Sequence, residues 1–214
     1  MFDAVIFDMD GLLLDTEALI LKATRIAFAS VGVQVPEDFL HWTIGVDSLK
    51  CRARARELFG DTLDMDKVER IHHQTWLELT ETHIPLKPGV EDIMAFLISN
   101  NIPRAIATSS NRESADRKAG VVDLGRWVDT IVTIDCVENP KPAPDPYLKA
   151  AELLGCDPKR CLAFEDSNTG ARSAYDAGMT VVQVPDIVQP AGVPVHFIAP
   201  TLVDGAKMAG IMPR

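Results

Sequence analysis

Short apolar runs recur along much of the chain and predict buried strands. They occupy five ranges, residues 4–7, 103–108, 130–134, 161–164 and 180–184. Most of these runs are continuous instead of alternating, which is typical of strands buried on both faces. Helix-periodic segments lie between them, at residues 90–100, 146–154 and 169–177. This alternation of strands and helices predicts an α/β fold built on a doubly wound parallel sheet.

The interval from residue 16 to residue 82 lacks a convincing strand and carries two helical stripes instead. The first stripe consists of Ile20, Ala23, Thr24, Ala27, Phe28 and Val31 and stops at Gly32. The second consists of Met65, Val68, His72, Thr75, Trp76 and Leu79. Each stripe lies on one face of a helix. We therefore predict an all-helical lid at residues 15–84, inserted into a core made of residues 1–14 and 85–214. Residues 13–15 and 84–88 are expected to act as hinges.

Composition and charge narrow the class of protein. The 214 residues are 47% apolar and 24% charged, which excludes a disordered chain. The net charge of −10 and the isoelectric point near 4.9 describe an acidic surface. Such a surface repels phosphate backbones and anionic lipid, so we expect neither nucleic acid nor a membrane as a main partner.

Targeting signals and cysteine spacing predict a cytoplasmic protein. No apolar run approaches the roughly 20 residues of a membrane-spanning helix, and Asp3, Asp8 and Asp10 interrupt the region where a signal peptide would be apolar. The four cysteines are scattered and show no metal-binding spacing, so they are expected to be reduced and structural: Cys51, Cys136, Cys156 and Cys161. The pattern contains no direct signal of the oligomeric state, and a monomer is our expectation.

Two carboxylates follow the first predicted strand, in the stretch Asp8-Met9-Asp10-Gly11. In open α/β sheets, ligands bind where the strands end. If the strand persists, Asp8 and Asp10 point to the same side, about 7 Å apart. Taken alone, the stretch also fits an ordinary charged turn. A calcium loop fits less well, because its pattern requires a third ligand before the glycine and a later Glu.

Three other strands or loops supply polar groups at the same end of the predicted sheet. Thr108 opens a hydroxyl-rich stretch after the second strand, although this stretch also fits a plain helix cap. Lys141 lies between prolines after the third strand, where a solvated turn lysine is the ordinary alternative. Glu165 and Asp166 end the fourth strand, where they could simply begin a helix.

Together, these groups would bring up to four carboxylates, one ammonium group and one or two hydroxyls to one end of the sheet. Carboxylates this close cannot all stay ionised without a cation among them. Hard oxygen ligands with an open coordination sphere favour Mg²⁺, which keeps water ligands and binds substrate phosphate directly. The combination therefore predicts magnesium-dependent phosphoryl chemistry.

The order of these motifs resembles the haloacid dehalogenase superfamily. The motifs are Asp8-Met9-Asp10-Gly11 with the following Asp15-Thr16, then Thr108, Lys141 in Lys-Pro-Ala-Pro-Asp, and Glu165-Asp166-Ser167. The resemblance runs from residue 2 to about residue 184. The helical insert is similar to the cap of the phosphatase and β-phosphoglucomutase-like branch. The resemblance therefore implies a Rossmann-like core and a hydrolase that acts as a phosphatase.

The resemblance also assigns roles to individual residues. It implies that Asp8 is the nucleophile that forms an aspartyl-phosphate and that Asp10 is the general acid and base. Thr108 and Lys141 would neutralise the transferring phosphoryl oxygens, which agrees with the charge repulsion that an attacking carboxylate meets. Metal ligation would involve Asp8, the main-chain carbonyl of Asp10, Asp166 and Glu165, with Glu165 bound directly or through water.

Further residues are candidates for binding phosphate or the rest of the substrate. Ser109, Asn111 and Arg112 lie at a predicted helix N-terminus, which favours anions. Thr16 follows the first motif. In the lid, Arg52 belongs to a locally basic segment with Lys50, Arg54 and Arg56, for which a solvated helix surface is the ordinary alternative.

The residue types also bear on the class of reaction. Within the superfamily, Asp10 argues for a phosphate ester substrate, because a true dehalogenase needs no acid for its leaving group. The β-phosphoglucomutase pattern has a His where this chain has Ile20, and an Arg that is missing near Gly45-Val46-Asp47-Ser48. We therefore expect a phosphatase for a sugar phosphate or a phosphoglycolate-like acid. A hexose-phosphate mutase and a non-catalytic protein that binds phosphorylated metabolites are the alternatives.

Overall fold

The computed structural model describes residues 2–44, 46, 48–128, 130–187 and 189–213 and divides the chain into two compact units. The first, here called the sheet unit, comprises Met1–Asp15 and Pro85–Arg214. The second, the helical unit, comprises Thr16–Ile84. Gly45 and Asp47, which belong to the stretch compared above with the mutase pattern, lie outside the described residues.

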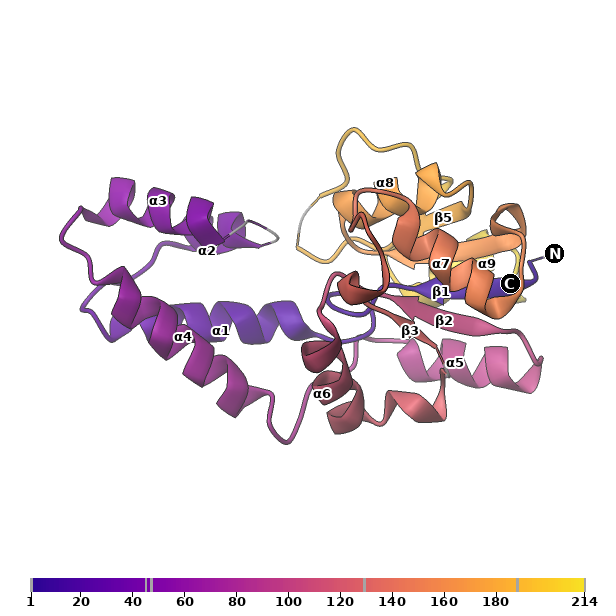
Figure 1. Cartoon of the computed structure of the whole chain (residues 1–214), viewed down its shortest axis with the longest axis horizontal. Coiled ribbons are helices and arrows are strands. Elements are labelled where there is room, and N and C mark those ends of the chain that lie inside the picture. The colour runs from indigo at the N-terminus through magenta and orange to yellow at the C-terminus, as the bar shows by residue number, and fades with distance from the viewer. Residues whose placement is uncertain (1, 45, 47, 129, 188, 214) are drawn as a thin grey trace. The chain divides into compact units, whose positions relative to one another are not determined.

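A six-stranded parallel sheet forms the centre of the sheet unit (Figure 1). Its strands lie in the order β3-β2-β1-β4-β5-β6. Their bounds are β1 Ala4–Phe7, β2 Arg104–Ala107, β3 Ile131–Val132, β4 Cys161–Glu165, β5 Thr180–Gln183 and β6 Phe197–Ile198. This arrangement confirms the predicted α/β fold with a Rossmann-like parallel sheet. The two-residue strand β6 was not predicted.

Helices cover both faces of this sheet (Figure 1). The longer ones are α5 Val90–Ser99, α6 Arg112–Val122, α7 Asp145–Leu154, α8 Asn168–Asp176 and α9 Leu202–Met208, with short 3₁₀ turns at Leu124–Arg126, Ile134–Cys136 and Pro158–Arg160. Helices α7 and α8 place small residues such as Ala150, Ala171 and Ala174 in one buried cluster with the strands. Small side chains let these two helices approach the sheet closely.

The opposite face of the sheet packs against α5 and α9. Phe7 of β1 and Phe164 of β4 stack there, with ring centroids 5.3 Å apart. A methyl group added at Gly205 of α9 would lie 2.5 Å from Val182 Cγ1 and 3.1 Å from Phe164 Cε1. A side chain at residue 205 would therefore force Val182 or α9 to move, because α9 crosses β5 at close range.

The helical unit contains α1 Thr16–Ala29, α2 Glu37–Thr43, α3 Ser48–Phe59 and α4 Met65–Leu79. The second predicted stripe lies on α4 and the first on α1, except that Val31 follows the end of α1; Phe28 from the first and Val68 from the second belong to one buried cluster. Phe28, Phe39 and Phe59 meet edge to face, with centroids between 5.3 and 5.7 Å apart. No helix among the described residues has both the length and the apolar character that a membrane crossing requires.

The strand register brings the predicted polar residues to one edge of the sheet. Phe7, the last residue of β1, pairs with Ile106 of β2 and with Phe164 of β4. The residues just beyond these positions therefore leave the sheet at the same level. They include Asp8 after β1, Thr108 after β2, and Glu165 and Asp166 at the end of β4.

The close approach at Gly205 gives a stability prediction. We expect Gly205→Ala to lower the free energy of unfolding by about 1–3 kcal/mol, because the new methyl group forces Val182 or α9 to move. Gly120→Ala in α6 is the matched control, since nothing lies within 4 Å of the added Cβ. It should be neutral or stabilise by about 0.4–1 kcal/mol. Urea denaturation of both variants tests this. Equal stability of the two variants would contradict the packing argument.

Candidate active site

Asp8 lies immediately after β1 and is almost completely buried. Its backbone N–H donates to the carbonyl of Phe164 at 3.0 Å, which holds the start of the loop against β4. Only 6% of the residue is exposed. Its Oδ1 atom accepts a hydrogen bond from Lys141 Nζ at 2.6 Å. A carboxylate and an ammonium group are therefore paired at the edge where open parallel sheets bind their ligands.

Lys141 links two carboxylates that come from different strands. Besides Asp8, its Nζ atom contacts Glu165 Oε1 at 2.5 Å, and its side chain is only 3% exposed. Burial by itself would lower the pKa of Lys141, but the charges of Asp8 and Glu165 outweigh burial and raise it. The ammonium group is therefore a permanent positive charge at this site.

Glu165 ends β4 with its carboxylate fully buried and held by several donors. Besides the bond from Lys141, Oε1 accepts one from the hydroxyl of Tyr147 at 2.8 Å. Oε2 accepts from the backbone N–H and the hydroxyl of Ser167 at 3.3 and 3.1 Å. A Cβ added at Gly170 of α8 would overlap this carboxylate, only 1.7 Å from Oε1. The absence of a side chain at residue 170 therefore makes room for Glu165.

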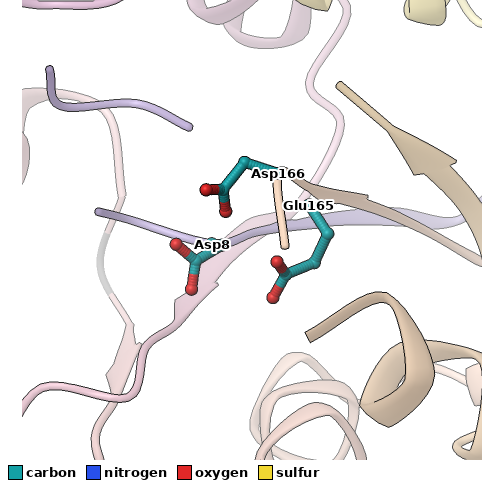
Figure 2. Close-up of side chains that lie close together, drawn as sticks. All are labelled: Asp8, Glu165 and Asp166. Carbon is teal, nitrogen blue, oxygen red and sulfur yellow. The ribbon is translucent and has the colours of Figure 1, made fainter. Parts of the chain in front are cut away.

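Three carboxylates converge at this edge of the sheet. Asp8, Glu165 and Asp166 each offer an oxygen within 4.8 Å of the others, and Figure 2 shows Asp8 and Asp166 turned toward each other. Burial, with the charges of Glu165 and Asp10, raises the pKa of Asp8 to about 7, although Lys141 opposes the shift. Burial, with the charges of Glu165 and Asp8, raises the pKa of Asp166 to about 9.

These donors fit a hard divalent cation. A carboxylate whose pKa is raised by its neighbours lacks compensating positive charge, and a cation among the three would supply it. All three donors are carboxylate oxygens, the ligand type that Mg²⁺ and Ca²⁺ prefer. Lys141 and Tyr147 already occupy Oε1 of Glu165, so Asp8 and Asp166 are the better placed of the three to bind a cation directly.

Asp10 lies close by, in a different environment. Its side chain is 26% exposed, and both carboxylate oxygens contact Lys118 Nζ at 2.5 Å. Oδ2 also accepts a hydrogen bond from the Ser110 hydroxyl at 2.9 Å and lies 3.5 Å from the Thr108 hydroxyl. The two acids of the first motif therefore differ, since Asp8 is buried with Lys141 and Asp10 is partly exposed beside Lys118.

Comparison with known proteins identifies the family. Residues 5–184 match the haloacid dehalogenase-like hydrolases. The chain belongs to this family.

Individual relatives agree with this assignment. The phosphorylated carbohydrates phosphatase of Thermotoga maritima is 36% identical over 180 residues, which cover 83% of this chain and 82% of the relative. Hexitol phosphatase B of Escherichia coli is 32% identical, with coverage of 85% and 83%. The crystal structure of a HAD family hydrolase from Deinococcus radiodurans with bound phosphate and sodium superposes with a TM-score of 0.82 at 26% identity, covering 98% of this chain and 94% of that one. The predicted enzyme class, a phosphoric monoester hydrolase, is confirmed.

The structure places the hydrolase's other predicted phosphate-binding residues around the start of α6. Ser109 is exposed. The side chain of Asn111 caps α6 by accepting the backbone N–H of Ser114 at 2.9 Å. The guanidinium group of Arg112 contacts Asp116, the carbonyl of Ile131 and the Cys136 sulfur. Arg112 is therefore tied to neighbouring elements of the sheet unit.

Two further candidates belong to the helical unit. Thr16 begins α1, and its buried hydroxyl has no hydrogen-bond partner among the described residues. Arg52 of α3 pairs with Asp66 at 2.6 Å and Glu69 at 3.0 Å, both on α4. Arg52 also lines a cavity of about 420 Å³ within the helical unit, together with Ile20 and His72.

Sequence reasoning missed two residues that support the site. Lys118 and Tyr147 contact Asp10 and Glu165 respectively. A weak signal for Lys118 was available, because it lies three residues after Ala115 and therefore on the buried face of α6. A lysine on the buried face of a helix requires a nearby negative charge or hydrogen-bond acceptors. Nothing near Tyr147 in the sequence indicates its partner.

The raised pKa values predict how stability depends on pH. In the folded chain the pKa values of Asp8 and Asp166 lie above their ordinary value of 3.8, so both groups bind protons more tightly there than in the unfolded chain. Between about pH 4 and about pH 9 these two groups therefore hold more protons in the folded chain than in the unfolded one, so their contribution to the stability of the metal-free protein falls as pH rises. A cation competes with those protons, so the stabilisation by Mg²⁺ should grow over the same range.

Thermal unfolding between about pH 5 and about pH 9, with chelator and with Mg²⁺, checks this. The melting temperature in chelator should fall with pH, and the gain from Mg²⁺ should rise. Asp166→Asn removes one of the two titrating groups and should flatten both trends. A gain from Mg²⁺ that is independent of pH would contradict the assignment of these carboxylates as metal ligands.

Proposed function

We propose that this hydrolase is a magnesium-dependent phosphatase that cleaves a small phosphorylated metabolite through an aspartyl-phosphate at Asp8. The observation that carries the proposal is the pairing of buried Asp8 with Lys141 inside a cluster of three carboxylates. A carboxylate that must attack a phosphate dianion needs fixed positive charge beside it, and Lys141 supplies part of that charge.

Asp8 acts as the nucleophile in the first step. One of its carboxylate oxygens attacks phosphorus and forms the new P–O bond while the ester P–O bond breaks. Lys141 lies within hydrogen-bond distance of Asp8, so its ammonium group can also contact the transferring phosphoryl oxygens. The Thr108 hydroxyl, at the end of the neighbouring strand β2, is assigned to the same oxygens.

Asp10 acts as the general acid and base. It gives a proton to the leaving alcohol oxygen in the first step. In the second step it takes a proton from the water that attacks phosphorus, while the P–O bond to Asp8 breaks, phosphate leaves and the Asp8 carboxylate is restored. The partial exposure of Asp10 suits this role, because the group must reach both a substrate oxygen and a water molecule. Asp8, buried and ion-paired, is suited to covalent catalysis instead.

The metal site is assigned to Asp8 and Asp166, with the main-chain carbonyl of Asp10 and with Glu165 directly or through water. A bound Mg²⁺ would supply positive charge that neutralises the phosphoryl oxygens and the crowded carboxylates. Glu165 also positions Lys141 whether or not a metal is bound, because its hydrogen bond with the ammonium group holds that group beside Asp8.

Sugar phosphates and polyol phosphates are the substrates we infer. The relatives named above are a phosphatase for phosphorylated carbohydrates and a hexitol phosphatase. The helical unit is assigned the part of the family's cap, and it contains the cavity lined by Ile20 and Arg52. The apolar Ile20 stands where the mutase pattern has a His, which favours the phosphatase over the mutase.

Phosphate release from a panel of sugar, polyol and acid monophosphates tests the proposal. Release should require Mg²⁺, stop in chelator, and fall at least about 10³-fold in Asp8→Asn, because the amide cannot act as the nucleophile. Asp92→Asn, an exposed residue of α5, is the matched control and should keep wild-type activity.

Three outcomes would count against the proposal. Turnover that persists in chelator would contradict the metal site. Turnover that persists in Asp8→Asn would contradict the nucleophile. Isomerisation of a hexose phosphate without net phosphate release, on addition of a sugar bisphosphate, would show a mutase instead.

A further inference from the structure

Lys118 is a buried lysine whose hydrogen-bonding capacity is used entirely at the candidate active site. Its side chain is 3% exposed. Its Nζ atom contacts both Asp10 oxygens at 2.5 Å and the Ser110 hydroxyl at 2.8 Å. An ammonium group has three N–H donors, so these three contacts account for all of them.

These three contacts leave Lys118 no free donor for a substrate. A substrate oxygen could bind Nζ only by displacing Asp10 or Ser110. Asp10, in contrast, is 26% exposed. Any influence of Lys118 on the reaction must therefore pass through Asp10.

The two oxygens of Asp10 are held unequally. Oδ2 accepts a hydrogen bond from the Ser110 hydroxyl at 2.9 Å, contacts Lys118, and has the Thr108 hydroxyl at 3.5 Å. Among the described residues, Lys118 is the side chain that contacts Oδ1. The Ser110 hydroxyl accepts from Lys118 and donates to Oδ2, which closes a small ring of hydrogen bonds. Oδ2 therefore has the fuller set of partners, whereas Oδ1 has the contact with Lys118 and keeps a lone pair for a further partner.

We propose that Lys118, with Ser110, is a positioning residue that fixes the Asp10 carboxylate by Oδ2 and presents Oδ1 to the leaving-group oxygen of the substrate. This inference rests on the proposed function, in which Asp10 is the acid. When the ester P–O bond breaks, its electron pair goes to the leaving oxygen, and the proton moves there from Asp10 Oδ1. Asp10 becomes an anion in that step, and the fixed ammonium group of Lys118 stabilises the charge that develops.

A series of phosphate monoesters with different leaving groups tests this role. An alkyl phosphate has a poor leaving group, so its cleavage depends on proton donation to the leaving oxygen. The leaving group of p-nitrophenyl phosphate is good and needs almost no proton donation. The quantity to measure is kcat/KM, because it reports steps up to the first irreversible one and so isolates formation of the phosphoenzyme. Lys118→Met should lower kcat/KM for alkyl phosphates by about 10²-fold or more and that for p-nitrophenyl phosphate far less.

Two further variants keep the test decisive. Ser110→Ala removes the hydroxyl bridge and should show the same dependence on the leaving group at smaller magnitude, even if Lys118→Met does not fold. For alkyl phosphates, the double variant Lys118→Met with Asp10→Asn should have the same kcat/KM as Asp10→Asn alone, because Lys118 acts through Asp10. Lys149→Met, in the exposed pair with Glu152, is the matched control and should behave as wild type.

The outcomes separate this inference from the proposed function. An equal loss for all esters in Lys118→Met or Ser110→Ala would show a merely structural role and overturn the inference. No loss for alkyl phosphates would also overturn it. In both cases the wild type still hydrolyses the esters, so the proposed function stands. If wild-type protein hydrolyses none of the esters, the proposed function itself fails.

Discussion

Three carboxylates meet where β1 and β4 leave the sheet, and two of them are paired with one buried ammonium group, so that negative charge is in excess at the site. Lys141 lies within 2.6 Å of both Asp8 and Glu165, yet one positive charge cannot balance three acids. Burial raises the pKa values of Asp8 and Asp166, and the neighbouring negative charges raise them further. The site therefore favours a cation and, beyond it, a phosphate whose own oxygens need positive charge.

The fold makes this crowding possible. The parallel register of β1 with β4 brings Asp8 to the level of Glu165, although the two are far apart in the chain. Helix α8 then passes close to Glu165 because residue 170 is a glycine. Tyr147 of α7 and Ser167 before α8 satisfy the Glu165 carboxylate, so that a fully buried acid can hold Lys141 in place. Gly170 therefore helps to place Lys141 beside Asp8, because it makes room for the Glu165 carboxylate that binds Lys141.

Much of the fold and the centre of the site could be predicted from the sequence, because their signals are local. Continuous apolar runs located β1, β2, β4 and β5, and acids directly after β1 and at the end of β4 indicated the reactive edge. Strand β6 was missed because two residues are too few to form a pattern. Asp10 and Lys118 are 108 residues apart, and only the folded chain shows that they pair. Likewise, the partner of Tyr147 is a property of packing and not of any motif.

Covalent catalysis by Asp8 is tested most directly by mass spectrometry of the enzyme stopped by acid during turnover of a good substrate. In the presence of Mg²⁺, we expect one phosphoryl group on the peptide that contains Asp8, and we expect this phosphopeptide to be missing when chelator replaces the metal. Phosphate release without any phosphorylated peptide would contradict covalent catalysis by Asp8. A phosphoryl group found on a different residue would contradict the assignment of the nucleophile.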